Sequence, residues 1–188
     1  MNTINIHKIN KYRNGENLID WDNQQERLER YPEITENLKW FLAGFADGES
    51  SFCLNLKNRP NSKFGYSIDP AFYVYQHSKN RYILETFKYM FNCGSIHLKT
   101  SPNSVLTYQI AGIKNNLSKV IPFFDQYSLI TKKETFKYFK EGVYRLKNKE
   151  HFSESGYIEI IEIAYKMNQL GKGRKWQKEF VLSRILRD

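Results

Sequence analysis

Two carboxylates stand two positions apart in the segment WFLAGFADGESSFC, residues 40–53. Asp47 and Glu49 follow an apolar run with the composition of a buried helix. Carboxylate oxygens are ligands that hard divalent ions such as Mg²⁺ accept, together with backbone carbonyls, water and phosphate. A metal held there could activate water and stabilise the leaving oxygen in phosphodiester hydrolysis. Two acids in a loop are by themselves more often simply solvated, so the neighbouring residues must decide between these interpretations.

Two glycines in the same segment predict a close contact between helices. Gly44 and Gly48 are four positions apart and share one side of a helix, with Ala43 and Ala46 nearby. Each glycine inside a helix costs roughly 1 kcal/mol relative to alanine, so a contact should offset that cost. Small residues at this spacing let two helix backbones approach closely. The partner is either another helix of the same chain or, since this string occurs once, the same helix of a second subunit.

A two-fold pairing of this helix would bring the acids of two subunits together at the axis. Two facing carboxylates repel one another unless cations lie between them. The pairing therefore predicts a divalent-metal site shared by two subunits. It also predicts a dimer interface formed by Ala43, Gly44, Ala46 and Asp47. In the simpler alternative Gly48 only caps the helix.

Hydrophobic periodicity predicts the elements that position these residues. Pro32, Thr35 and Glu36 are typical of a helix start, and the helix ends at the turn Asp47–Gly48. The pattern then predicts four strands, at 51–59, 67–76, 95–99 and 105–112, and helices at 80–91, 115–124, 131–148 and 155–169. The 115–124 helix is interrupted at Pro122, and Pro70 favours an edge position or a bulge in its strand. The order is α-β-β-α-β-β-α, an α+β fold with an antiparallel sheet and additional C-terminal helices.

Each predicted strand has one apolar side, which we expect to lie under the helices. The inward residues are Phe52, Leu54, Leu56, Phe72, Val74, Ile96, Leu98, Leu106, Tyr108 and Ile110. The opposite side is polar, basic and partly aromatic, with Asp69 as its possible acid. Since the DNA major groove admits a two-stranded β-ribbon, this face is a candidate for base contacts. The candidate residues are Asn55, Lys57, Arg59, Tyr73, Tyr75, His97, Lys99, Thr107 and Gln109.

Composition favours one globular domain that meets a polyanion. The 188 residues carry a formal net charge of +9, and 40% of them are hydrophobic. No run of 18 apolar residues predicts a membrane span, and residues 1–15 lack the apolar core of a secretory signal. Residues 1–32 are polar and predict an N-terminal arm, with the domain at 33–188 ending in a basic tail. The tail residues Lys172, Arg174 and Lys175 are expected to contact phosphates.

Two cysteines and the residue usage bear on the compartment. Cys53 and Cys93 lack the spacing of a zinc site, which favours a reducing compartment and ordinary thiols. The many lysines, asparagines and isoleucines fit an A·T-rich gene, so we expect an organellar gene product, in the mitochondrion or chloroplast.

The motif LAGFADGE, followed by SSF, resembles the signature of the LAGLIDADG homing endonucleases. Further elements follow in that family's order: Gln76–His77 at the end of a strand, then NCGSI, TYQIAG, LITKK and GKGRKW. Together they span roughly residues 38–176. A short degenerate motif alone is a weak signal, but this ordered set is a strong one.

The resemblance implies roles for particular residues. Glu49 matches the metal-binding acid of the motif, and Gly48 matches the residue that lends a backbone carbonyl. Asp47 resembles a helix-ending structural acid. Gln76 matches the polar residue that positions water, and Lys132 or Lys133 matches a basic residue near the scissile phosphate. The catalytic candidates are therefore Glu49, Gln76, Lys132 and Lys133, and the motif's last glycine is Ser50 here.

One motif per chain implies, in this family, a homodimer that cuts a long, roughly palindromic site in double-stranded DNA. The implied cofactor is Mg²⁺ or another divalent metal, and the implied role is the spread of the encoding intron. The alternative on the same fold is an intron maturase, which binds intron RNA and has weak or lost cleavage. A DNA-binding regulator without catalysis is a third possibility. None of these functions involves a membrane.

Overall fold

The computed structural model describes residues 33–99, 104–167 and 176–185. The predicted N-terminal arm and the tail residues Lys172, Arg174 and Lys175 lie outside these ranges. Within them, no helix is both long enough and apolar enough to cross a membrane.

The described elements follow the predicted order. The first half contains α3 (Glu36–Glu49), β1 (Ser50–Asn58), β2 (Tyr66–His77), η2 (Ser78–Asn80), α4 (Arg81–Phe91), β3 (Ser95–Leu98) and β4 (Val105–Ala111). The second half contains α5 (Ile113–Asn115), the π-helical turn η3 (Asn116–Val120), α6 (Ile121–Gln126), α7 (Lys133–Lys147), η4 (Glu150–Phe152), α8 (Glu154–Met167) and α9 (Lys178–Ile185). The α-β-β-α-β-β-α order with additional C-terminal helices is therefore confirmed.

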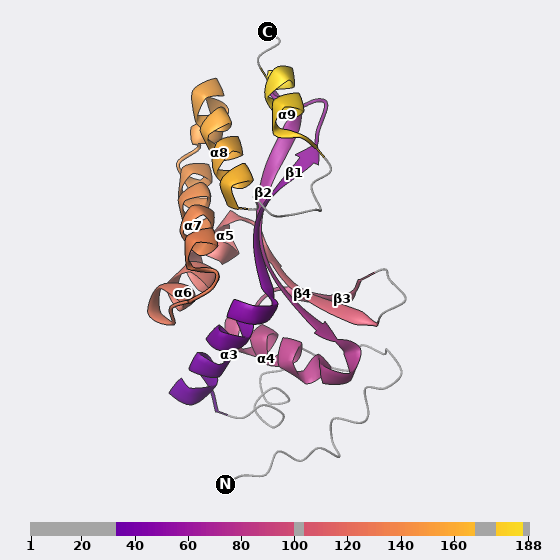
Figure 1. Cartoon of the computed structure of the whole chain (residues 1–188), viewed down its shortest axis with the longest axis vertical. Coiled ribbons are helices and arrows are strands. Elements are labelled where there is room, and N and C mark those ends of the chain that lie inside the picture. The colour runs from indigo at the N-terminus through magenta and orange to yellow at the C-terminus, as the bar shows by residue number, and fades with distance from the viewer. Residues whose placement is uncertain (1–32, 100–103, 168–175, 186–188) are drawn as a thin grey trace.

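The four strands form one antiparallel sheet in the order β1-β2-β4-β3. The β1–β2 ribbon extends beyond β4, because β2 pairs with β4 only from Ala71 onward. Helices α6, α7 and α8 lie to one side of this curved sheet (Figure 1). Residues 115–124, predicted as one helix broken at Pro122, comprise the last residue of α5, the π-helical turn η3 and the first four residues of α6, whose first turn contains Pro122.

Aromatic side chains fill the core between the sheet and its helices. The ring of Phe52 lies 5.1 Å from that of Phe72 and between 5.3 and 5.4 Å from those of Phe124, Phe136 and Phe139. Such ring pairs add to the stabilisation from burial itself. Helix α7 lies close on β1, since a Cβ added at Gly142 would stand 2.4 Å from Leu54. This packing fixes the beginning of α7 relative to the α3–β1 junction.

One prediction about the sheet is confirmed and one is wrong. Pro70 lies at an edge position early in β2, as predicted, because β2 is paired there with β1 only and its pairing with β4 begins at Ala71. The Pro70 carbonyl accepts from the Gly112 N–H at 2.9 Å. Leu98 is not covered by helices: it is 64% exposed, because it ends the short edge strand β3.

Candidate active site and nucleic-acid interface

Helix α3 delivers the predicted metal ligand to the surface. Thr35 begins the helix, since its Oγ1 accepts a hydrogen bond from the Leu38 N–H at 3.3 Å. Glu49 is the last helical residue and Ser50 begins β1, so the carboxylate stands where helix and sheet meet. Glu49 and Gly48 are both exposed. Within the described part of the chain, the Glu49 carboxylate accepts no hydrogen bond.

Asp47 holds the segment that precedes α7. Its Oδ2 accepts from the Thr131 N–H and its Oδ1 from the Lys132 N–H, both at 2.9 Å. The Thr131 hydroxyl also donates to the Asp47 carbonyl at 3.0 Å. Partial burial favours a higher pKa for Asp47, but the hydrogen bonds from Thr131 and Lys132 outweigh it and lower the pKa. Asp47 is therefore a charged tether whose oxygens are already occupied.

The Lys132 ammonium lies against the end of α3. Its Nζ donates to the carbonyl oxygens of Gly48 at 2.8 Å, of Ala46 at 3.4 Å, and of Asp47. These terminal carbonyls carry the partial negative charge of the helix end. Burial lowers the pKa of Lys132, although the charges of Asp47 and Glu49 act in the opposite direction. Lys133, by contrast, is exposed at the first position of α7, so Lys132 is the lysine that the fold brings to Glu49.

Gln76 lies at the end of β2 that faces the α3–β1 junction. Ser50, the first residue of β1, pairs with Val74, and Gln76 lies two residues further along β2, where it pairs with Leu106 of β4. The Gln76 Oε1 accepts from the His77 N–H at 2.7 Å, which fixes the orientation of the amide. Of the predicted residues, Lys132 contacts the end of α3 beside Glu49, and Gln76 lies at the end of β2 next to the first residues of β1; their catalytic roles stay a prediction.

The chemistry of this end fits a hard cation. Three carbonyl oxygens converge there on a positively charged nitrogen, and an exposed carboxylate adjoins them. Oxygen donors of these kinds are those that Mg²⁺ and Ca²⁺ use. One chain offers only part of a coordination sphere, since its described residues include no group of three or more His, Cys, Asp or Glu side chains placed to hold a metal. Mg²⁺ usually keeps several waters and is held by one or two carboxylates together with substrate phosphates.

The α3 surface only partly matches the predicted dimer interface. Gly44 and Gly48 are exposed, and a Cβ added at either would meet nothing within 4 Å. Ala43 and Ala46 do not belong to that surface, because both are buried in the core of their own chain. The spacing of small residues did not predict that large apolar side chains would also be exposed near this surface. Trp40, Phe41 and Ile130 are 53%, 55% and 86% exposed. Exposed aromatics on a helix that also buries a core face were the available signal.

Ser50 fits its position without backbone strain. Its φ of −106° and ψ of 169° are extended, so this position does not require glycine. The side chain is buried, and its Oγ has no hydrogen-bond partner in the described residues. The substitution therefore costs an unsatisfied hydroxyl and leaves the turn intact.

Most of the predicted base-contacting residues lie on the open face of the sheet. Asn55, Tyr73, Tyr75 and Gln109 are half-buried there, and His97 is exposed. Lys57, also exposed, pairs with Asp69 at 2.5 Å. Lys99 follows β3, and its Nζ stands 5.1 Å from the centre of the Tyr75 ring. Arg59 lies just past β1, in the hairpin loop. Thr107 is wrong as a contact, because its side chain is buried between its larger cross-strand neighbours Tyr75 and His97.

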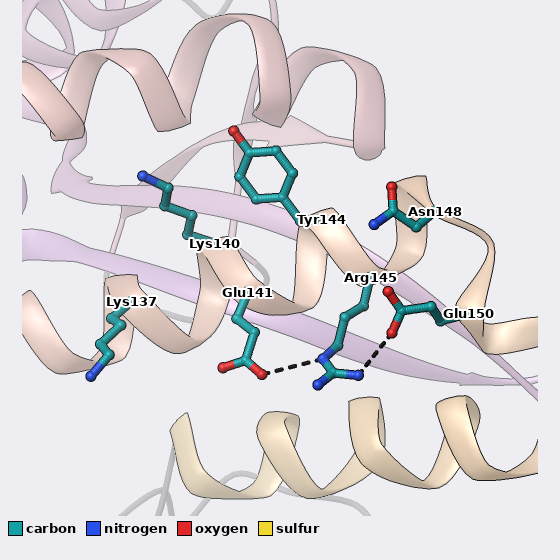
Figure 2. Close-up of a pocket in the computed structure, with 7 residues that line it drawn as sticks. All are labelled: Lys137, Lys140, Glu141, Tyr144, Arg145, Asn148 and Glu150. Carbon is teal, nitrogen blue, oxygen red and sulfur yellow. Dashed lines mark hydrogen bonds and ion pairs between the residues drawn. The ribbon is translucent and has the colours of Figure 1, made fainter.

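The helical side of the molecule has a different charge pattern. A hollow of about 530 Å³ along α7 is lined by Lys137, Lys140, Glu141, Tyr144, Arg145, Asn148 and Glu150. Figure 2 shows Arg145 between Glu141 and Glu150. The Arg145 Nε is 3.2 Å from the Glu141 Oε1, and its Nη1 is 2.8 Å from the Glu150 Oε2. Arg145 also contacts Glu159, and Lys140 pairs with Asp125. Positive charge in this hollow is largely neutralised by the chain itself.

The fold, with its open polar sheet and the acid at the end of α3, is similar to that of solved homing endonucleases. I-Vdi141I, an archaeal intron-encoded homing endonuclease complexed with DNA, is 31% identical with a TM-score of 0.73, over 80% of this chain and 96% of that one. I-CeuI, a group I intron-encoded homing endonuclease complexed with DNA, is 27% identical with a TM-score of 0.75, over 82% and 79%.

The family model described as LAGLIDADG endonuclease matches residues 42–143. Since this is more than half of the 188 residues, the chain belongs to the LAGLIDADG endonuclease family, as the motifs indicated. The DNA endonuclease I-CeuI from Chlamydomonas moewusii is 38% identical over 95 residues, which are 50% of this chain and 44% of that protein. The homing endonuclease I-ApeII from Aeropyrum pernix is 26% identical over 73% of this chain and 83% of that protein.

The chain spans only part of several curated relatives. Its match covers 30% and 26% of two probable intron-encoded endonucleases from Neurospora crassa, and 44% of I-CeuI.

Proposed function

We propose that this chain is a divalent-metal-dependent endonuclease that cuts double-stranded DNA at a long, pseudo-palindromic site as a homodimer, and so promotes the mobility of its intron. The observation that carries the proposal is the meeting of Glu49, the Gly48 carbonyl and Lys132 at the end of an open sheet face. The carboxylate and carbonyl fit a cation, and the ammonium fits a phosphate. A phosphodiester backbone lying along the sheet would reach both.

Glu49 and the Gly48 carbonyl are the groups that would hold Mg²⁺. When bound, the metal supplies an activated water and neutralises the departing oxygen. Lys132 then exchanges its contacts with the helix carbonyls for the scissile phosphate, where its charge stabilises the additional negative charge of the transition state. Gln76, with its Oε1 fixed by the His77 N–H, presents its amide N–H groups to orient the attacking water.

A second copy of the chain completes the site in this proposal. The exposed strip of Gly44 and Gly48, bordered by Trp40 and Phe41, allows close approach of the same helix from a partner. That approach brings two copies of Glu49 to one axis, where shared cations offset their repulsion. The two sheets then extend away from the axis and follow two half-sites, which gives a target with approximate two-fold symmetry.

Nucleic acid is assigned to the sheet and not to the helical side. The α7 hollow already neutralises Arg145 and Lys140 with its own acids, whereas the sheet presents amides, tyrosines and lysines with a single acid, Asp69, among them. This pattern supports the sheet as the nucleic-acid-binding face. Relatives solved with DNA on the same fold, such as I-Vdi141I and I-CeuI, support the DNA endonuclease over the maturase.

The deciding experiment compares Glu49→Gln with the wild type on the intronless junction of the host gene. Wild type should cut both strands with Mg²⁺ and only bind with Ca²⁺, in keeping with a relative, I-SmaMI, seen on uncleaved DNA with calcium. Glu49→Gln should bind the same duplex and not cut it. No metal-dependent double-strand cut by wild type would overturn the nuclease assignment, and assisted splicing of intron RNA would establish the maturase.

The organellar location stays an expectation, since relatives come from an alga, fungi and an archaeon.

A further inference from the structure

One row of hydrogen bonds crosses all four strands of the open sheet face. Asn55 on β1 donates from Nδ2 to the Tyr73 hydroxyl on β2 at 3.0 Å. Gln109 on β4 donates from Nε2 to the same hydroxyl at 3.3 Å. Its Oε1 lies 3.2 Å from the Nε2 of His97 on β3. The strand order β1-β2-β4-β3 makes these four residues neighbours, although they are up to 54 positions apart in the sequence.

The row has a definite direction, with Tyr73 at its centre. The phenol oxygen receives N–H groups from both amides, which fills its acceptor capacity. Its own O–H therefore remains to be donated outward. Burial raises the pKa of Tyr73, with the Asn55 hydrogen bond opposing it, so the phenol keeps its proton at neutral pH.

Asn55 keeps the hydrogen-bonding groups that recognition of adenine requires. One of its N–H groups is committed to Tyr73, and its second N–H and its Oδ1 have no partner in the described residues. An amide N–H and its adjacent oxygen match adenine N7 and N6 in the major groove. Gln109 differs, because its Nε2 and Oε1 ends are both engaged, by Tyr73 and His97.

We propose that Tyr73 is a positioning residue for specificity: its hydroxyl locks the Asn55 amide so that Asn55 reads an adenine in each half-site, with Gln109 and His97 as supports. The inference rests on the proposed function, because it requires duplex DNA on the open face. Without the hydroxyl, the Asn55 amide rotates freely and accepts other bases. Ordering a side chain before binding removes an entropy cost from the correct complex and keeps the mismatch penalty at the wrong base.

The test selects bound duplexes from a randomised DNA pool with Ca²⁺ in place of Mg²⁺, using the full chain. Asn55→Ala identifies the base pair that Asn55 reads, as the position whose preference disappears. Tyr73→Phe should lower the adenine preference at that position by about tenfold. Tyr144→Phe is the matched control: it removes the hydroxyl of an exposed tyrosine on α7, away from the open sheet face. It should leave the Asn55 position within twofold of wild type.

Two further readouts separate positioning from general damage. The double variant Asn55→Ala, Tyr73→Phe should lose no more preference at that position than Asn55→Ala alone, since both changes remove one function. Wild type should bind a selected site about tenfold more weakly when 7-deazaadenine replaces the adenine, and this measurement does not depend on the folding of any variant.

The outcomes are distinguishable. If wild type enriches no sequence, the proposed function fails. If wild type is selective but Tyr73→Phe keeps the wild-type preference at the Asn55 position, or 7-deazaadenine binds as well as adenine, the proposal about Tyr73 and Asn55 is overturned and the nuclease assignment stands.

Discussion

Asp47 and Lys132 hold each other from both directions. The Asp47 carboxylate accepts from the Lys132 backbone N–H at 2.9 Å, while the Lys132 side chain returns to the carbonyl of Asp47 and to that of Gly48, 2.8 Å away. Asp47, whose oxygens accept backbone hydrogen bonds, thus places the Lys132 ammonium beside Glu49, the candidate metal ligand. This explains why two carboxylates stand two positions apart at the end of α3: one anchors the α7 segment and the other faces outward.

Asp47→Asn should destabilise the fold and misplace Lys132. The amide replaces one of two accepting oxygens with an NH₂ group that faces a backbone N–H, and a lost hydrogen bond to a charged group costs about 1.5–3 kcal/mol. We expect the free energy of unfolding in urea to fall by that amount and cleavage to fall by at least tenfold. Glu49→Gln is the control, which should lose cleavage at unchanged stability. Wild-type stability in Asp47→Asn would contradict the tether.

The stability that Asp47 provides should depend on pH in a defined direction. The pKa of Asp47 in the folded chain is lowered, whereas an unfolded Asp titrates at about 3.9. A lowered acid pKa stabilises above the unfolded value, and this contribution is lost as pH falls through the folded value. The difference in unfolding free energy between wild type and Asp47→Asn should therefore be constant between about pH 5 and 7 and shrink below about pH 4. A difference that grows on acidification would refute it.

Lys132 and Lys133 should differ sharply in their importance for cleavage. Lys132→Met keeps much of the side-chain volume and removes the charge beside the Gly48 carbonyl, so we expect a loss of at least a hundredfold in the single-turnover rate. Lys133→Met changes an exposed residue and should alter the rate by less than threefold. The measurement is the rate of double-strand cutting at saturating enzyme. Equal losses in both variants would show general charge, and not position, to be responsible.

The order of elements could be predicted because each strand has period-two apolar residues and each helix has a continuous apolar side. Errors and open alternatives arose where a residue's neighbours come from distant sequence. For Pro70 the choice between an edge position and a bulge stayed open, because the place where pairing with β4 begins, at Ala71, depends on strand register. Leu98 looked buried because period two says nothing about where the helices stop.

The site was predictable where a motif carries it and ambiguous where only tertiary contacts decide. Glu49 and Gly48 followed from the motif, but the choice between Lys132 and Lys133 needed the Asp47 tether across 85 positions. Ala43 and Ala46 belong to the same motif as Gly44, yet they lie on the side of the helix that is buried in the core of their own chain. The row through Tyr73 could not be foreseen, because the diagonal reach from Tyr73 to Asn55 depends on strand register and side-chain length together.

Ser50→Ala should stabilise the protein slightly and leave cleavage unchanged. The change removes a buried hydroxyl with no partner in the described residues, and such a group costs about 1–3 kcal/mol. Ser50→Gly removes the same hydroxyl but adds backbone freedom in a strand, which offsets about 0.5–1 kcal/mol of the gain. Ser50→Ala should therefore have the higher melting temperature of the two. A lower melting temperature for Ser50→Ala than for wild type would mean that the hydroxyl has a bonding partner, such as a buried water.

Gly44→Glu should separate the dimer without unfolding the monomer. A Cβ at Gly44 meets nothing within 4 Å inside the chain, so the monomer accommodates a side chain. The two introduced carboxylates, facing each other across the proposed axis, would repel and would hold the α3 backbones apart. We expect light scattering at micromolar concentration to give a dimer for wild type and a monomer for Gly44→Glu, with cleavage lost and far-UV circular dichroism unchanged. Ser118→Glu, an exposed change of the same charge on η3, should remain dimeric and active. A Gly44→Glu protein that stays dimeric would place the subunit contact elsewhere and remove the basis for a metal site shared between two copies of Glu49.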